Sequence, residues 1–385
     1  MHRTVKSKFY PEIETLRGLA SLAVVLGHCY LWSFPQYLQL GETYELRWLD
    51  VLMSGIFDPQ PAVLVFFVLS GFVLGCQLEA SAPVTSRAYL AYIVRRLLRL
   101  IPTMWFSLVI SLGLWVALGV VDESARQIVP LALTWFWRGL LFLDFSLNPV
   151  IWSLYVEVIV SALLPLMFWC SRCADWTMNA AVFLALFALC LLISKPMFLS
   201  FAVFFFVGLL ISYVPRTFDK VMGGVFGLVA GVSALAVFTW GPEIAVLSTE
   251  KRDLTLWRPW AWIEVPACAL LVYFVVRERF APISAILTTP VLRFIGKISF
   301  SVYLLHFPIM IFVDAVLAHN GLAFRPELPV LNWIGLFGIK TAIVCALSVI
   351  ASVASYRFVE VPSAKLGRSL ASCIVKRHLA LPSTF

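Results

Sequence analysis

Charged residues are scarce in this chain. They make up 13% of its 385 residues, whereas an average soluble domain carries about a quarter. Hydrophobic residues make up 61%. No soluble fold of this size has enough interior to bury so much apolar surface, so a soluble globular enzyme is excluded. Intrinsic disorder and nucleic-acid binding are excluded as well, because both need more charge and fewer apolar residues.

Cysteine provides neither a disulfide framework nor a metal site, although the chain has eight scattered cysteines. Only Cys170 and Cys173 form a CxxC pair, and no second pair completes a zinc site. Residues 1–16 are polar and charged, and no cleavable signal peptide is visible in them. The first apolar segment is therefore expected to remain in the protein as a membrane anchor.

Long apolar runs are what the sequence has in abundance. A helix crosses a bilayer with about 20 apolar residues, so this chain has room for roughly ten spans. We predict an all-α fold, a polytopic integral membrane helical bundle with about ten transmembrane helices. One transmembrane domain is expected over residues 1–360, followed by a cytoplasmic tail at 361–385. The predicted spans lie near residues 17–34, 61–78, 100–120, 150–169, 179–194, 199–214, 222–240, 260–277, 298–317 and 333–355.

The placement of Lys and Arg predicts the orientation. With the N-terminus in the cytoplasm, 20 of the 29 Lys and Arg residues fall in inner segments and 8 in outer ones. This bias follows the positive-inside rule, and it predicts that both termini are cytoplasmic. The apolar segment 128–146 is interrupted by Arg138 and Asp144. We expect it to be an interfacial helix or a re-entrant piece, because a full crossing there would turn most of the later basic residues outward.

Two ionisable residues lie in the first predicted span. Arg17 and His28 are eleven residues apart, which places them within about 20° on one helix face and about 16 Å apart along the axis. Charge inside a bilayer is costly, so such residues are candidates for function. Taken alone, Arg17 is also explained as a side chain that reaches for the membrane surface, and His28 as a hydrogen-bonding partner for another helix.

The next two spans carry further candidates. Ser70 and Gly71 lie at about half depth in the second span, where a close-packing point is the simpler interpretation. Arg95, Arg96 and Arg99 stand at the inner start of the third span, three and four residues apart, so they can form a cluster. The cluster is explained either as a lipid anchor or as a clamp for a phosphorylated cytosolic ligand, because guanidinium forks match phosphate oxygens.

Two later spans add polar residues at a similar depth. Ser153 and Glu157 lie one turn apart in the fourth span, and Tyr303 and His306 share a face of the ninth. By rise per residue, Glu157 and His306 fall in the middle third of the membrane, together with two residues of earlier spans, His28 and Ser70. Four polar side chains from four helices at one depth predict one buried site.

Five motifs, in their order and spacing, resemble the acyltransferase-3 family of integral membrane acyltransferases. The motifs read LRGLASLAVVLGH, FFVLSGFVL, RRLLRLIP, WSLYVE and IGKISFSVYLLHFP, and the resemblance covers essentially the whole chain. The family's signature of an arginine and a histidine separated by ten residues maps onto Arg17 and His28, and its basic motif onto Arg96 and Arg99. The chain is similar to the stand-alone form that lacks an esterase-like C-terminal domain.

The resemblance implies a membrane-embedded enzyme that moves an acyl group, commonly acetyl, from cytosolic acyl-CoA to a hydroxyl. The acceptor would be a glycan, a glycan-containing surface polymer or a small molecule. Because such acceptors are commonly bacterial surface glycans, a bacterial inner membrane is the expected location. Acyl-CoA would be a donor co-substrate, and no bound cofactor, metal or nucleic acid is expected. A non-catalytic transporter or flippase of a lipid-linked or acylated molecule is the alternative.

The chemistry of acyl transfer assigns expected roles to these residues. A hydroxyl acceptor needs a base, and the imidazole of His28 is the first candidate, with His306 the weaker one. Glu157 is expected to orient an imidazole or to balance an arginine. The remaining candidates are Ser70, Ser153 and Tyr303 for contacts with the substrate, and Arg17, Arg95, Arg96 and Arg99 for the CoA phosphates. The pantetheine arm of CoA is expected to lie along the face of the first span, between Arg17 and His28.

The predicted topology is tested by reporter fusions. Fusions after residues 175 and 218 should both report a cytoplasmic location, because the bias of Lys and Arg places these two positions inside. An alkaline phosphatase and a fluorescent-protein reporter at each position give opposite signals, so each serves as the control for the other. An outside location at both positions would show that 128–146 crosses the membrane.

Overall fold

A computed structural model describes residues 11–33, 53, 55–81, 85–173, 175–192, 197–213, single positions between 227 and 240, 261–277, 288–324 and 330–376. The chain divides into two compact units. Unit 1 comprises residues 1–81 and 159–297, and unit 2 comprises residues 82–158 and 298–385. The boundaries fall inside two helices, α7 (Ile151–Cys173) and α14 (Pro290–His319).

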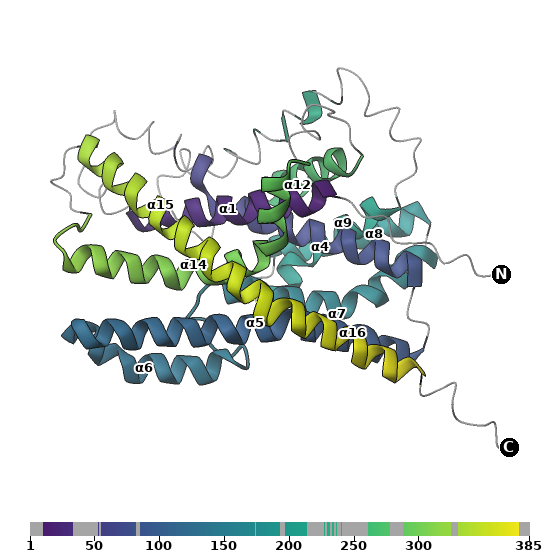
Figure 1. The fold of residues 1–385 in the computed structure, drawn as a ribbon. Helices are drawn as coiled ribbons and strands as arrows, with labels where there is room; N and C mark the ends of the chain where they lie inside the picture. The colour runs from purple at the N-terminus through teal and green to yellow at the C-terminus, as the bar shows by residue number, and fades with distance from the viewer. Residues whose placement is uncertain are drawn as a thin grey trace. The chain divides into compact units, whose positions relative to one another are not determined.

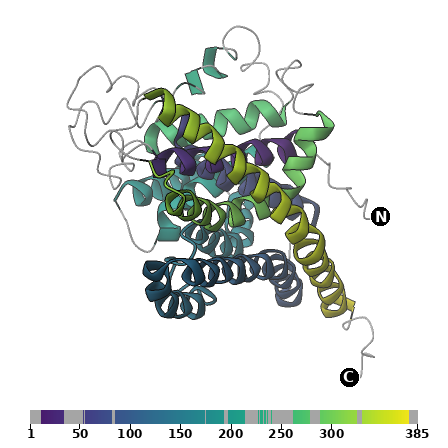
Figure 2. The ribbon, with the colours of Figure 1, turned by 60° about the vertical axis from the view of Figure 1, so that its left-hand side comes forward.

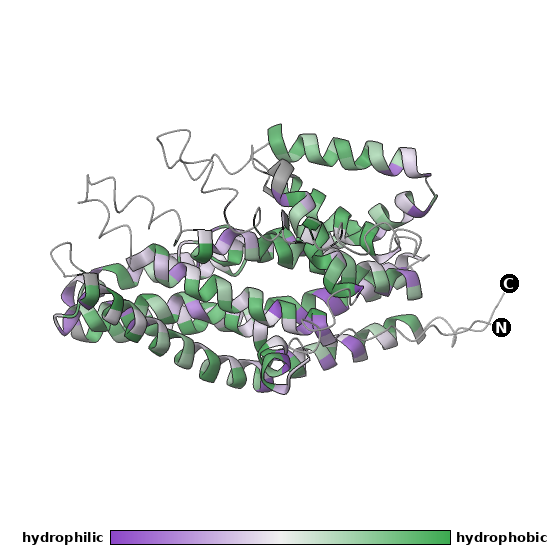
Figure 3. Ribbon diagram, turned by 90° about the horizontal axis from the view of Figure 1, so that it is seen from above, coloured by the Kyte–Doolittle hydropathy of each residue, from purple (hydrophilic) through white to green (hydrophobic). Residues whose placement is uncertain are grey.

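Every regular element of the described residues is helical, which confirms the predicted all-α fold class. Apolar residues cover most turns of these helices (Figure 3). Five of the described helical segments are long and apolar enough to cross a membrane, and three more are apolar but shorter. The composition and the helices together show an integral membrane protein.

Unit 1 is built around two glycine contacts between its helices α4 (Pro59–Ser81) and α9 (Met197–Ser212). Gly71 lies against the backbone of Phe205, and Gly208 lies against the backbone of Val68, so closely that an added Cβ would collide at either position. Because glycine has only a hydrogen atom as its side chain, the two helix backbones can approach closely, as they do where membrane helices associate. Gly71 therefore has the packing role that the sequence indicated as the simpler interpretation.

The remaining helices of unit 1 surround this pair. α1 (Pro11–Ser33) and α12 (Ala261–Val276) pack against α4, and α8 (Trp176–Leu192) packs against α9. Tyr30 of α1 stacks on Phe57, which lies just before α4, with ring centroids 5.3 Å apart. These contacts hold the C-terminal end of α1 beside the start of α4.

Unit 2 contains a helical hairpin of α5 (Ser86–Val121) and α6 (Glu123–Gly139), which lie side by side in Figures 1 and 2. The indole nitrogen of Trp105 in α5 donates a hydrogen bond of 3.2 Å to the carbonyl of Leu140, just beyond α6. A long helical rod formed by α15 (Val330–Ser355), a π-helical turn (Tyr356–Glu360) and α16 (Val361–Lys376) completes the unit. α16 packs on α5, so the first part of the predicted tail is a packed helix.

The helices agree with the predicted spans in position more than in length. Each predicted span except 222–240 coincides with a described helix, and 222–240 lies largely outside the described residues. α5 begins 14 residues before the predicted span 100–120 and has 36 residues. The apolar pattern marks the part of a helix that fits in hydrocarbon, whereas the backbone hydrogen bonds continue into its basic, polar start. α1 is not among the five long apolar segments, because Arg17 and His28 interrupt its apolar residues.

The segment 128–146 behaves as neither a full span nor a loop. Its first part belongs to α6, which doubles back along the C-terminal half of α5 and ends opposite Leu108, the residue that contacts Gly139. Residues 140–150 are then irregular until α7 begins at Ile151. The interpretation of 128–146 as an interfacial helix or a re-entrant piece stays a prediction.

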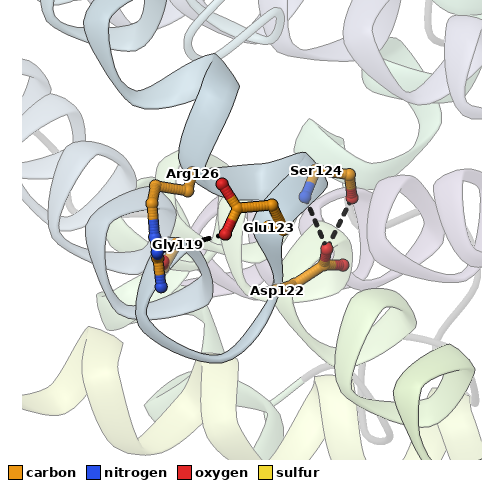
Figure 4. A network of polar contacts seen from close by, with 5 residues as sticks. All are labelled: Gly119, Asp122, Glu123, Ser124 and Arg126. Atoms are coloured by element: carbon orange, nitrogen blue, oxygen red, sulfur yellow. Dashed lines mark hydrogen bonds and ion pairs between the residues drawn. The ribbon is translucent and has the colours of Figure 1, made fainter.

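Asp122 forms the corner between α5 and α6 (Figure 4). Its Oδ1 accepts hydrogen bonds from the hydroxyl of Ser124 at 2.6 Å and from the amide of Ser124 at 2.8 Å. These bonds, that of the hydroxyl first, hold the pKa of Asp122 below its ordinary value. Arg126 closes the corner by donating from Nε to the carbonyl of Gly119 at 2.9 Å, and it pairs with Glu123 at 3.1 Å.

The corner predicts a pH dependence of stability. Because the pKa of Asp122 is lower in the folded protein, its contribution is fully present above the unfolded-state pKa of about 4 and is lost as the pH falls further. Asp122→Asn should keep the cap but remove this titration, since Asn caps helices as well as Asp does. Thermal unfolding in detergent from neutral pH to pH 3 should show a smaller acid loss in Asp122→Asn than in the wild-type protein. Identical acid profiles for the two proteins would contradict this role of Asp122.

Candidate functional site

One continuous helix in unit 1 carries the first two candidate residues. α1 includes both Arg17 and His28, and both side chains are half-buried. No kink-forming proline lies between them, so the helical spacing that was assumed from the sequence holds. Gly27, next to His28, lies against the backbone of Phe57 and Pro59, so the helix backbone at His28 is held close to the start of α4.

Ser70 lies in α4 of the same unit and is half-buried. Its neighbour Gly71 makes the close contact with α9, so the position of Ser70 is set by backbone packing on one side of α4. Unit 1 therefore carries His28 and Ser70 on two helices that pack against each other.

The strongest polar contact in unit 2 is an ion pair between two candidate residues. The Nη2 atom of Arg96 lies 2.5 Å from Oε1 of Glu157, and the two side chains are only 11% and 18% exposed. The pair joins α5 to α7. It agrees with one of the two expected roles of Glu157, the balancing of an arginine.

The three arginines of the basic motif have different surroundings. Arg95 is exposed, whereas Arg96 and Arg99 are half-buried. The backbone at Arg95 lies next to Gly367 of α16, so this side of α5 is where α16 packs. A phosphate would find the side chain of Arg95 in the open, but would compete with the carboxylate of Glu157 for Arg96.

Ser153 and Tyr303 are brought together in unit 2. Their hydroxyl oxygens lie 2.7 Å apart, and both are buried. Both hydroxyls also contact the carbonyl oxygen of Val150, Tyr303 at 3.2 Å and Ser153 at 3.0 Å. The two residues thus form one hydrogen-bonded group between the start of α7 and the middle of α14.

His306 lies one turn beyond Tyr303 and is fully buried. Its Nδ1 atom is 3.2 Å from the carbonyl oxygen of Val302, which only accepts, so Nδ1 carries the proton in this contact. The ring packs beside those of Tyr303 and Phe307, with centroids 6.0 and 6.4 Å away.

The units divide the candidate residues. Unit 2 holds Arg96 with Glu157, and Ser153 with Tyr303 beside His306. Unit 1 holds Arg17, His28 and Ser70. The gathering of His28, Ser70, Glu157 and His306 into one site stays a prediction. Within the described residues, no group of three or more His, Cys, Asp or Glu side chains is placed to hold a metal ion.

Asn148 is a polar residue that the sequence reasoning missed. Pro308 has no amide hydrogen, so the carbonyl of Leu304 one turn earlier in α14 loses its helical partner. The Nδ2 atom of Asn148 donates to that carbonyl at 2.9 Å and to Oγ of Ser107 at 3.3 Å. The proline was a usable signal that some side chain must supply this donor, but only the fold shows which one.

A second ion pair was also missed. Lys340 of α15 is fully buried, and its Nζ atom lies 2.7 Å from Oδ1 of Asp314 in α14. The sequence placed Lys340 inside a span without naming a partner. The ammonium group also lies 5.2 Å from the centre of the Phe324 ring. This pair joins α14 to α15, and it gives a partner to a buried Lys that would be costly alone.

Glu264 of α12 is a further polar residue that the sequence reasoning missed. It is buried in unit 1, and neither carboxylate oxygen has a hydrogen-bond partner among the described residues. It lies in the first turn of α12, where the negative end of a side chain is favoured by the helix dipole.

The comparison with protein families gives one match. Residues 10–353 match a family model described as an acyltransferase domain. This range covers nearly the whole chain and includes every candidate site residue. No curated protein and no solved structure matches the chain.

The pair of Arg96 and Glu157 is tested by a double-mutant cycle. Arg96→Ala and Glu157→Ala should each destabilise the protein, because each leaves a largely buried charge without its partner. The double variant should be more stable than the sum of the two losses predicts, with a coupling energy of about 0.5–3 kcal/mol. The measurement is chemical unfolding in detergent.

The exposed pair of Arg126 and Glu123 is the matched control. Its side chains are 59% and 72% exposed, so its coupling energy should lie at or below about 1 kcal/mol. Equal coupling energies in the two cycles would contradict the buried ion pair.

Proposed function

Because the chain belongs to the acyltransferase-3 family, we propose that it transfers an acyl group from cytosolic acyl-CoA to a hydroxyl of a glycan or a glycan-containing surface polymer. Acetyl is the acyl group that we propose. The observation that carries the proposal is the continuous helix α1, which holds an arginine and an imidazole about 16 Å apart on one face. The proposed location is a bacterial inner membrane, with both termini in the cytoplasm.

His28 is the proposed general base. Its imidazole takes the proton of the acceptor hydroxyl while the hydroxyl oxygen attacks the thioester carbon. The carbon–sulfur bond then breaks, and the imidazolium returns the proton to the CoA thiolate. The products are the O-acylated acceptor and free CoA, so the reaction is balanced without a further reactant.

Arginines at the cytoplasmic end of the helices are the proposed binding groups for the CoA phosphates. A guanidinium fork forms two parallel hydrogen bonds with phosphate oxygens. Arg95 and Arg99 suit this task, because the side chain of Arg95 is exposed and that of Arg99 lies one turn away on the same helix. Arg96 would share its charge between Glu157 and the ligand. Arg17, near the start of α1, is proposed to bind a CoA phosphate as well.

The buried polar residues of unit 2 are proposed to contact the reacting groups. The hydroxyl pair of Ser153 and Tyr303 is proposed to contact the substrate. His306 presents Nε2 as a second acceptor for a proton. Ser70 in unit 1 is proposed to contact the acceptor. Glu157 orients Arg96 through their ion pair.

The proposed base is tested with His28→Ala. Loss of a general base typically lowers a rate by about 10²–10⁴-fold, so transfer of labelled acetyl from acetyl-CoA to the acceptor should fall by that factor. Membrane insertion and the apparent melting temperature should stay close to those of the wild-type protein, since His28 is only half-buried. The measurement uses purified protein in nanodiscs, with the acceptor identified by glycan mass spectrometry of deletion and wild-type cells.

His319→Ala is the matched control, because His319 is an exposed histidine at the end of α14. It should transfer acetyl at the wild-type rate. Near-normal activity in correctly inserted His28→Ala would remove His28 from the mechanism. Export of a labelled glycan without any acyl transfer by the wild-type protein would favour a flippase.

A further inference from the structure

α5 carries a polar face that leads from its basic start into the membrane. Arg96, Arg99, Thr103 and Ser107 follow one another at intervals of three or four residues, so they lie within about 80° of arc. Thr103 and Ser107 are 1% and 0% exposed. By helical rise, Ser107 lies about 16 Å beyond Arg96 along the axis, and Thr103 lies about 10 Å beyond it.

Asn148 contacts this face at Ser107, and its side-chain oxygen has no hydrogen-bond donor within the described ranges. A carbonyl oxygen only accepts hydrogen bonds, so the contact with Leu304 fixes which end of the amide is the nitrogen. The other end, Oδ1, is buried and has no hydrogen-bond partner among the described residues. Ser107 cannot fill this role, because its hydroxyl already donates to the carbonyl of Met104 at 2.8 Å.

Thr103 presents a second open group on the same face. Its hydroxyl is buried and has no hydrogen-bond partner in the described part of the chain, not even within its own helix. A buried polar group without a partner costs about 1–3 kcal/mol, and the hydrocarbon around a membrane helix offers no water in compensation. Thr103 lies about 6 Å of helical rise from Ser107, the residue that Asn148 contacts. Two such groups along one face indicate that a ligand supplies the missing partners.

We propose that Thr103 and Asn148 bind the amide groups of the pantetheine arm of the acyl-CoA donor. This inference rests on the proposed function. The arm is a narrow chain with two amide N–H donors, one nearer the phosphates and one nearer the sulfur. Thr103 takes the amide nearer the phosphates, because it lies closer to Arg96 and Arg99 along α5. Asn148 takes the amide nearer the sulfur.

The hydrogen bonds of Asn148 connect this path to the buried hydroxyl pair. Leu304, which Asn148 holds, is the residue after Tyr303, and Val150, which contacts the hydroxyls of Tyr303 and Ser153, is two residues after Asn148. An arm that ends at Asn148 therefore brings its thioester next to the buried hydroxyls of Ser153 and Tyr303. The arm would also fit along α1, where Arg17 and His28 are separated by a similar length. We place it along α5, because two buried groups that lack partners among the described residues, Thr103 Oγ1 and Asn148 Oδ1, lie there.

The test compares three variants in the full chain. Thr103→Val removes the hydroxyl and keeps the shape of the side chain. Asn148→Ala removes the open acceptor, and its melting temperature shows whether loss of the bond to Leu304 unfolds the protein. Ser111→Ala is the control, because Ser111 lies one turn beyond Ser107 on the same face and its hydroxyl donates to the carbonyl of Ser107 at 2.8 Å. Affinity for CoA and KM values for acetyl-CoA and for the acceptor are measured in nanodiscs.

A role in binding predicts a specific pattern. Thr103→Val should unfold at the wild-type temperature or above it, because it loses an unsatisfied group. Its dissociation constant for CoA and its KM for acetyl-CoA should rise about three- to tenfold, the value of one hydrogen bond. Its KM for the acceptor and its kcat should stay unchanged, and Ser111→Ala should match the wild-type protein throughout.

A truncated donor resolves the order along the arm. S-acetyl-N-acetylcysteamine keeps only the amide nearer the sulfur, so the penalty of Thr103→Val should disappear with this donor and that of Asn148→Ala should remain. A raised KM for the acceptor alone would overturn the inference and assign the two groups to an acceptor hydroxyl. Wild-type affinities in both variants would overturn it in favour of buried water or a path along α1. A wild-type protein that neither binds CoA nor transfers acetyl would instead refute the proposed function.

Discussion

The need of every buried polar group for a partner, where no water is at hand, shapes unit 2 more than any other constraint. Pro308 frees the carbonyl of Leu304 in the middle of α14, and Asn148 supplies the missing donor. This single bond ties the irregular segment before α7 to α14. The start of α7 is thereby positioned so that Ser153 meets Tyr303, and one turn later Glu157 meets Arg96.

The same constraint explains how a basic motif serves two purposes. Positive charge at the ends of membrane helices is favourable, and Arg95 near the start of α5 is an exposed side chain. Arg96 is turned by about 100° on the helix and is drawn inward by Glu157. Neighbouring residues of one motif thus divide into an exposed group and a group that belongs to the protein interior.

The two kinds of close contact in the protein have different physical origins. In unit 1, α4 and α9 approach because Gly71 and Gly208 have no side chains, and this packing needs no polar group. In unit 2, helices are joined by ion pairs and hydrogen bonds, including the fully buried Lys340 with Asp314. Arg96 and Lys340, which would be costly alone, become tolerable there because each pairs with a carboxylate of a neighbouring helix.

The order and spacing of apolar residues by themselves determined the helical class and the position of most helices, because hydrocarbon selects for apolar length. The charged residues that interrupt 128–146 also predicted that this segment is not a full span. The shared face of Arg17 and His28 also follows from the sequence, because helical geometry is local. The partner of Glu157, the partner of Lys340 and the role of Asn148 were decided only by tertiary structure. A polar residue within an apolar segment indicates that a partner is needed, but not which residue it is. The partner lies up to 156 residues away along the chain, on a helix brought near by packing.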